Sequence, residues 1–400
     1  MEAPGKLLRK EPFVGIPSFQ GGFSKYLGAY QLGCLLILCA AVDFGTGEDP
    51  WPIFKLQKEF NAPGKSPPLS AEFYTGWLTH WGEKNAQTDA DFTAAALEKI
   101  LQKNGSAVLY MAHGGTNFGF YNGANTGVDE ADYKPDLTSY DYDAPIRESG
   151  DVDNSKFNAI RRVIARYSSV PLPSIPSNNE KARYGPIHLQ REAFVFDMFD
   201  FTNSTNVFKS ETPMSMEYVG QVENMGRVNY GSFIFDRKGI LSSVYLDKEQ
   251  VKGWKMFPIP LHNLNEMSTY NPITQVAYSA FSGISSFRKK LIYKNGNTSK
   301  EPAFYSGHFL IDKSSQVKDT FISFNNWGKG IVFVNDFNIG RYWPLRGPQC
   351  NLYVPAPLLK QGDNFLVILE LESPDPELVV HTVDEPDFTC GSSGTSLHQL

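Results

Sequence analysis

A short aromatic segment of this chain places an acid among rings. Residues 70–84 read SAEFYTGWLTHWGEK, in which Glu72 is followed by Phe73, Tyr74 and Trp77. An ionised carboxylate is costly to bury among such rings unless polar groups hydrogen-bond to it. A sugar site would use both features, because sugar C–H faces pack on aromatic rings and glycoside hydrolysis needs carboxylates at the anomeric carbon. The same spacing also fits the edge of an aromatic core, with Glu72 as a solvated surface residue.

Helix and strand patterns alternate up to about residue 170. Thr88 and Asp91 form a capping box, and apolar side chains then recur at helical spacing from Phe92 until Gly105. The apolar run SAVLYMA that follows predicts a fully buried strand, and a second amphipathic helix is predicted over residues 154–167. Helix, strand, loop and helix in this order are typical of a parallel α/β barrel.

Three polar or glycine-rich segments would meet on one face of such a barrel. Sites in this fold lie at the carboxyl ends of the strands. Glu72, the loop HGGTNFGFYNGANTG with Gly114 and Gly115, and the segment TSYDYDAP (138–145) all occupy that position in the predicted order. We therefore expect these segments to lie close together.

The second half of the chain has a different character. Residues 168–181 read as a Pro/Ser-rich linker, and the segments beyond it are short alternating strands separated by Gly, Asn and Asp turns. This pattern predicts β-sandwich or jelly-roll domains. The chain after Pro374 is polar and is expected to be disordered.

Composition excludes some classes of function. The 400 residues carry a net charge of −6 with no long basic run, which argues against nucleic acid as a partner. The four cysteines have no metal-like CxxC spacing, and we expect neither a metal nor a cofactor. A disulfide between Cys350 and Cys390 and two free thiols are equally compatible with the sequence.

One strongly apolar segment, residues 26–42, follows several basic residues. It is compatible with a signal-peptide core, with a membrane anchor, or with a buried element of the fold. Three N-glycosylation sequons, at Asn104, Asn203 and Asn297, are compatible with secretion, although such triplets also arise by chance.

Longer motifs carry a family resemblance. The stretches EFYTGWLTHWG, YMAHGGTNFGFYNGAN, TSYDYDAPIRESGD, ENMGRVNYG and IGRYWPLRGPQCNLYVPAPLL resemble the signature blocks of glycoside hydrolase family 35, the β-galactosidases. They are most similar to the plant members of the type close to animal lysosomal β-galactosidase, and the resemblance runs from about Val42 to Leu378. It implies a (β/α)8 TIM barrel carrying the site, two β-domains after it, and retaining hydrolysis of terminal non-reducing β-D-galactosides. It also implies a secretory location, either vacuolar or extracellular.

The resemblance assigns roles to five residues. Glu72 matches the family's catalytic nucleophile, at the end of the seventh barrel strand. Tyr74, Tyr110, Tyr140 and Tyr142 match tyrosines that contact galactose or close its pocket. Phenolic hydroxyls suit this role, because they hydrogen-bond sugar hydroxyls and the nucleophile itself.

The chain also departs from the family pattern. Retaining hydrolysis needs a second carboxylate, which the family places in an Asn-Glu pair on the fourth barrel strand. No such pair precedes Glu72 in this sequence, and Glu223 beside Asn224 lies in a motif of the β-domains instead. We therefore expect a partial barrel of about strands six to eight, and a chain that lacks the acid/base region.

These expectations give the following organisation: an atypical segment (1–41), the C-terminal part of a TIM barrel (42–168), a linker (169–185), a truncated first β-domain (186–265), a second, galactose-binding-like jelly roll (266–378) and a tail (379–400). The alternative function is a non-catalytic carbohydrate-binding or interaction protein. In that case Trp327, Tyr342 and Trp343 are candidates to stack on glycans, although a core position explains them equally.

Overall fold

The computed structural model of the chain describes residues 41–129, 132–195, 223, 225–235, 239–252, 254, 261 and 300–391. These residues form two compact units, and we describe each by itself. The first unit holds the described residues up to Leu78, with Ala86–Gly115 and Tyr140–Asn179; the second holds Thr79–Asn85, Thr116–Ser139 and the described residues from Glu180 onward.

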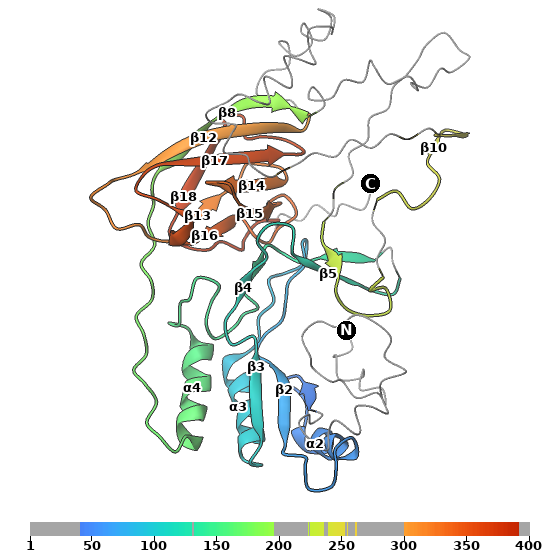
Figure 1. Cartoon of the computed structure of the whole chain (residues 1–400), viewed down its shortest axis with the longest axis vertical. Helices are drawn as coiled ribbons and strands as arrows, with labels where there is room; N and C mark the ends of the chain where they lie inside the picture. The colour runs from blue at the N-terminus through green and yellow to red at the C-terminus, as the bar shows by residue number, and fades with distance from the viewer. Residues whose placement is uncertain are drawn as a thin grey trace, which may run out of the picture. The chain divides into compact units, whose positions relative to one another are not determined.

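The first unit is a three-stranded parallel sheet with three helices (Figure 1). Its elements follow the chain as β1 (Val42–Phe44), α2 (Pro50–Glu59), β2 (Leu69–Tyr74), α3 (Ala90–Leu101), β3 (Ser106–Tyr110) and α4 (Ser155–Tyr167). The strands lie in the order β1-β2-β3, so each strand pairs with the next one along the chain. This is the α/β alternation that the sequence predicts.

Each of these helices begins at a side chain that accepts a hydrogen bond from the first turn. Asp49 caps α2, Asp89 caps α3 by accepting from the N–H of Phe92 at 2.7 Å, and Asn154 caps α4 by accepting from the N–H of Phe157 at 2.9 Å. Such caps satisfy N–H groups that have no partner inside the helix. The predicted capping box at Thr88 is one residue early, because Asp89 takes the cap position.

The helices cover one face of the parallel sheet. Their buried side chains, among them Phe54, Leu97, Ile100, Ile160 and Val163, form a single cluster with Val42, Phe44 and Phe73 of the strands. The helix predicted over 154–167 is confirmed as α4. Because alternate residues of a strand point to opposite faces, the residues next to Phe44 and Phe73 point away from this core.

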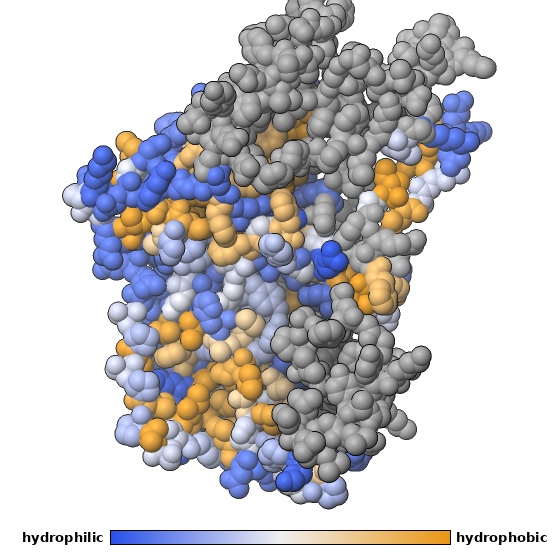
Figure 2. Space-filling view, viewed as in Figure 1, coloured by the Kyte–Doolittle hydropathy of each residue, from blue (hydrophilic) through white to orange (hydrophobic). Residues whose placement is uncertain are grey.

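Strand β3 is an edge of the sheet and is only partly buried. Val108, at its centre, has 56% of its surface exposed, and Phe92 on α3 has 52% exposed. Figure 2 shows apolar surface gathered over this unit. The prediction of a fully buried strand over 106–112 is therefore wrong.

The second unit is built around eight antiparallel strands. They are β8 (Pro186–Phe194), β12 (Ala303–Ile311), β13 (Thr320–Ser323), β14 (Gly330–Val334), β15 (Phe337–Tyr342), β16 (Asn351–Val354), β17 (Gly362–Glu370) and β18 (Val379–Val383), with a 3₁₀ turn at Ala356–Leu358. Their order is β15-β14-β17-β12-β8-β18-β13-β16. Strands from the two ends of this order, with Ile339 on β15 and Leu352 on β16, share one hydrophobic cluster. The sheet therefore curls over a common core, as in a sandwich.

Two predicted boundaries in this unit are wrong. Strand β8, expected in the first β-domain, pairs with β12 and β18 of the large sheet. The prediction of disorder after Pro374 is also wrong for the described residues, which reach residue 391: β18 lies between β8 and β13, and Cys390 forms a disulfide with Cys350. Both errors involve pairings between residues far apart in the sequence, which local patterns do not reveal.

Shorter strands complete the described structure. The chain passes between the units within β4 (Gly115–Thr116) and β7 (Ser139–Tyr140); the second unit also contains β5 (Gly123–Thr126), β6 (Tyr133–Pro135), β9 (Arg227–Val228), β10 (Tyr245–Leu246) and β11 (Glu249–Gln250). Among the described residues, no helix has the length and apolar character needed to cross a membrane. Most of the apolar segment 26–42, the sequons at Asn203 and Asn297, and much of the predicted first β-domain lie outside the described residues.

Candidate active site

The candidate nucleophile lies on the face of the parallel sheet that the helices leave uncovered. Phe73 belongs to the helix-covered core, so its neighbours on β2, Glu72 and Tyr74, point to the opposite face. Tyr74 is paired in register with Tyr110 at the end of β3. The strands are parallel, so their carboxyl ends bring these side chains together, as the sequence predicts.

Glu72 is held by a phenol from its own strand. The hydroxyl of Tyr74 donates a hydrogen bond to Oε2 of Glu72 at 3.0 Å. Burial, and then the Glu72 carboxylate, raise the pKa of Tyr74 far above its ordinary value. Tyr74 therefore stays protonated and acts as a permanent donor, which orients the carboxylate and leaves its other oxygen for chemistry.

Three more tyrosines complete a continuous aromatic cluster in the first unit. The ring of Tyr110 lies 6.0 Å from Tyr74 and 5.5 Å from Tyr142, and Tyr140 lies 5.4 Å from Tyr142. The hydroxyls of Tyr110 and Tyr140 are 3.3 Å apart. Trp77 contacts both Tyr74 and Tyr142, at 5.6 and 6.2 Å between ring centroids. The five residues assigned from the sequence are therefore adjacent, with Glu72 at one side of the cluster.

The loop that carries Tyr140 and Tyr142 has an unusual backbone. Tyr142 and the next residue, Asp143, have φ angles of 60° and 50°, a left-handed region that costs about 1–2 kcal/mol for each non-glycine residue. Two glycines let this loop approach the strand ends. A Cβ on Gly76 would collide with the carbonyl oxygen of Tyr142, and one on Gly114 would lie 2.7 Å from the Cα of Asp141.

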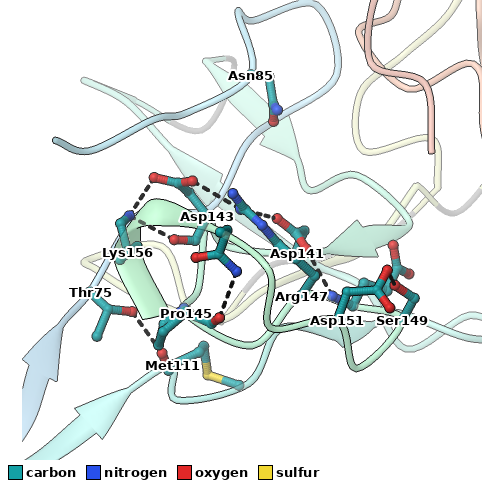
Figure 3. A network of polar contacts seen from close by, with 12 residues as sticks. Thr75, Asn85, Met111, Asp141, Asp143, Pro145, Arg147, Ser149, Asp151 and Lys156 are labelled. Atoms are coloured by element: carbon teal, nitrogen blue, oxygen red, sulfur yellow. Dashed lines mark hydrogen bonds and ion pairs between the residues drawn. The ribbon is translucent and has the colours of Figure 1, made fainter. Parts of the chain in front are cut away.

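Ion pairs and hydrogen bonds hold the loop that carries Tyr140 and Tyr142 (Figure 3). One nitrogen of Arg147 lies 3.0 Å from a carboxylate oxygen of both Asp141 and Asp143, the two residues that flank Tyr142. Lys156 on α4 forms an ion pair with Asp143 and also donates to its carbonyl oxygen at 2.7 Å. Asp143 further accepts the backbone N–H of Thr88 at 2.7 Å. These bonds fix both sides of Tyr142.

Lys156 occupies a position that is unfavourable for a cation in general. It is almost fully buried, in the first turn of α4, where the helix dipole opposes positive charge. Burial lowers its pKa, against the opposing effect of Asp143. A buried lysine at a helix N-terminus needs a specific partner, and here that partner is Asp143, whose backbone is in the left-handed region.

Asp43 is a second carboxylate on this face, and the sequence reasoning missed it. It lies on β1 between the buried Val42 and Phe44, and it pairs in register with Glu72. Burial, and then the Glu72 charge, raise the pKa of Asp43 to about 6. The signal that could have revealed it is the alternation in AVDFG, where one acid separates two apolar residues.

The end of the aromatic motif belongs to the second unit. There Nδ1 of His80 lies 2.7 Å from Oε2 of Glu83, and Nε2 lies 3.4 Å from Oδ1 of the buried Asp136. Burial raises the pKa of Asp136 to about 6, and His80 opposes this shift. Within the described residues, no group of three or more His, Cys, Asp or Glu side chains is arranged to hold a metal.

Comparison with known protein families gives three matches along this chain. Residues 33–167 match the family described as Glycosyl hydrolases family 35; residues 205–260 and 302–364 match the first all-beta domain and the galactose-binding domain of beta-galactosidase. The chain is 52% identical to Beta-galactosidase 17 of Arabidopsis thaliana over 436 aligned residues, which cover 90% of this chain and 62% of the relative.

The chain is similar to plant and animal members of glycoside hydrolase family 35. Beta-galactosidase 8 of Oryza sativa subsp. japonica is 50% identical over 88% of this chain, and human Beta-galactosidase is 33% identical over 92% of it. The alignments span 64% and 63% of these two relatives, so the chain covers less than two thirds of their length.

Two of the three C-terminal aromatic residues considered for glycan stacking are buried in the core. Trp327 and Tyr342 each expose only 1% of their surface and belong to the main cluster of the second unit. Trp343 is half-buried, with Nζ of Lys329 4.0 Å from its ring. Trp327 and Tyr342 are therefore core residues, which is one of the two alternatives that the sequence allowed.

Proposed function

We propose that this chain catalyses galactosyl transfer from terminal non-reducing β-D-galactosides, with Glu72 as the nucleophile of a retaining mechanism. The observation that carries the proposal is the hydrogen bond from Tyr74 to Glu72 beside a cluster of three further tyrosines. A carboxylate oriented by a phenol can attack the anomeric carbon, while other hydroxyls hold the sugar. The family's plant and animal members, named beta-galactosidases, support the choice of sugar.

The residues have distinct roles in this proposal. Glu72 supplies an electron pair to the anomeric carbon, and the bond to the aglycone breaks as the new ester bond forms. Tyr74 donates to the same carboxylate and keeps its attacking oxygen aligned. Tyr110 and Tyr140, with hydroxyls 3.3 Å apart, would bind sugar hydroxyls. Trp77, which is exposed, would form the wall on which the sugar packs, and the buried Tyr142 would support that ring.

We further propose that the parallel strands of the first unit correspond to barrel strands six to eight of a (β/α)8 fold. The strand order β1-β2-β3 and the helices on one face support this assignment, as does the family match over residues 33–167. Glu72 and the tyrosines then occupy the carboxyl ends of the strands, where barrel sites lie.

Two observations support a secretory location, which we propose to be the vacuole or the extracellular space. Cys350 and Cys390 form a disulfide, a bond that persists in oxidising compartments. The sequon at Asn104 lies exposed just after α3, so an N-linked glycan attached there would extend into solvent.

The resemblance implies an acid/base carboxylate in an Asn-Glu pair before the nucleophile, and this sequence has no such pair before Glu72. An alkyl galactoside needs a proton on its leaving oxygen, whereas a dinitrophenyl galactoside does not. We therefore propose that this chain transfers galactose from the activated aryl galactoside to Glu72 and releases it slowly to water, because no carboxylate of the family's acid/base motif is present to activate that water.

Azide tests this proposal because it needs no general base. The wild-type chain with 2,4-dinitrophenyl β-galactoside should release a burst of dinitrophenolate, and azide should then yield β-galactosyl azide of retained configuration. Glu72→Gln should give neither, whereas Glu59→Gln, on the exposed end of α2, should behave as the wild type. Galactose binding without any burst would instead establish the non-catalytic alternative. Ordinary hydrolysis of lactose would show that a second acid exists in the chain.

A further inference from the structure

The carboxylate of Asp43 lies on the same sheet face as Glu72. The side chains before and after it, Val42 and Phe44, are 6% and 3% exposed in the helix-covered core, so Asp43 must point to the other face. The register of β1 and β2 sets it directly opposite Glu72. The site therefore holds two carboxylates on neighbouring parallel strands.

We infer that Asp43 is a positioning residue that acts through Glu72: when Asp43 is ionised, its charge speeds transfer of the galactosyl group onto the Glu72 carboxylate. This inference rests on the proposed function. It adds that the rate of galactosyl transfer to Glu72 depends on pH through the ionisation of Asp43. Asp43 does not touch the anomeric carbon in this account. It changes the electrostatic energy of the group that does.

The charged groups around Asp43 come from few elements. From β2, Glu72 raises the pKa of Asp43 and its backbone N–H lowers it, and Asp43 in turn raises the pKa of Tyr74. Helix α2, which packs on β1, buries only Pro50, Ile53, Phe54 and Gln57, and its charged residues Lys55, Lys58 and Glu59 are exposed. Glu48, in the loop after β1, is partly buried. Among the described residues, burial and Glu72 therefore dominate the environment of Asp43.

The direction of the effect follows from the charges that change during the step. As Glu72 forms its bond to the anomeric carbon, its negative charge is consumed, and the sugar ring carries positive charge in the transition state. The electron pair of the broken bond leaves with dinitrophenolate, so no proton is exchanged. An ionised Asp43 repels Glu72 before the step and attracts the sugar during it, and both effects lower the barrier. A protonated Asp43 does neither.

The test is the pH profile of Glu72 ester formation. Dinitrophenolate release in the first turnover, from 2,4-dinitrophenyl β-galactoside, reports this step without any contribution from leaving-group protonation. Because the pKa of Asp43 is about 6, the wild-type rate should rise between pH 5 and pH 7. An interaction of about one pKa unit between the neighbouring carboxylates makes this rise about tenfold.

Asp43→Asn removes the titration and keeps the shape of the neutral acid. It should therefore match the wild-type rate at pH 5, lack the rise toward pH 7, and be about tenfold slower there. Asp91→Asn, an exposed acid on α3, should keep the wild-type profile. Thermal unfolding at pH 5, where wild-type Asp43 is mostly protonated, should be the same for Asp43→Asn and wild type, which confirms that the variant folds.

The outcomes separate the two proposals. A burst in Asp43→Asn that rises with pH as in the wild type would overturn the role of Asp43 and leave Glu72 as nucleophile. A wild-type burst that is constant between pH 5 and 7 would do the same. A wild-type chain that forms no ester at any pH would overturn the proposed function itself, and the inference on Asp43 with it.

Discussion

The close approach of Gly76 to the carbonyl oxygen of Tyr142 predicts that Gly76→Ala will disturb the candidate site. Gly76 follows β2, and a Cβ placed there would overlap the carbonyl oxygen of Tyr142, with the Tyr142 carbonyl carbon at 3.0 Å and the Cβ of Asp143 at 3.2 Å. Real Cβ atoms essentially never approach another heavy atom closer than 3.0 Å. The φ of Gly76 lies outside the left-handed region, so alanine is allowed there by its own backbone. The collision alone therefore determines the effect of Gly76→Ala.

The size of that effect can be worked from the overlap. Restoring normal contact requires the loop carrying Tyr142 to move by about 1 Å, in a close-packed environment where overpacking costs about 1–3 kcal/mol. A displacement of about 1 Å in positioning groups costs on the order of 10²-fold in rate. We expect Gly76→Ala to lower the burst rate with dinitrophenyl β-galactoside about 100-fold and to lower stability by about 2 kcal/mol.

The matched control is Gly45→Ala, in the same unit, where an added Cβ meets no atom within 4 Å. It should keep the wild-type burst rate and stability. Burst kinetics and denaturant unfolding measure the two effects on the same preparations. If Gly76→Ala reacts at the wild-type rate, the loop of Tyr142 does not shape the site and the reasoning fails.

Two further predictions concern buried charges. Lys156→Met removes the buried cation beside Asp143 and leaves Arg147 as the remaining ion-pair partner of that carboxylate. It should destabilise the first unit by about 2 kcal/mol in denaturant unfolding. Arg162→Met, at an exposed ion pair on the same helix, should cost less than about 0.5 kcal/mol, and equal effects would contradict the importance of burial. In the second unit, burial raises the pKa of Asp136 from its ordinary 3.8 to about 6, so the folded state keeps a proton that the unfolded chain releases. The contribution of this acid should therefore reduce stability by about 2 kcal/mol as pH rises from about 4 to about 7. Asp136→Asn should flatten that part of the pH dependence of unfolding, and an unchanged slope would refute the assignment.

Local sequence patterns predicted helices α3 and α4 of the first unit and its alternation of helix and strand, but they did not predict α2. The helix over 154–167 is readable because Asn154 is a good cap and Ala159, Ile160 and Val163 recur on one face. The cap of α3 was displaced by one residue, since Thr88 and Asp89 are both suitable cap residues and only the structure shows which accepts from Phe92. The resemblance to family 35, rather than any local pattern, selected the tyrosines.

The features that the sequence did not reveal depend on contacts between distant residues. Strand β18 is recognised as a strand only by its pairing with β8 and β13, which lie far away in the chain. The approach of Gly76 to Tyr142 depends on the path of a loop more than 60 residues later. Asp43 was missed because β1 is only three residues long, too short for a strand pattern to be evident.

The measurement that tests the central claim most directly is the location of a trapped galactosyl ester. A 2-deoxy-2-fluoro-β-galactosyl donor with a good leaving group slows release of the ester, because fluorine disfavours the positive charge of the transition state. Tandem mass spectrometry of the labelled chain should place one fluorogalactosyl group on Glu72, and none in Glu72→Gln. A label on Asp43 or on any other carboxylate, or no label although galactose binds, would contradict the account.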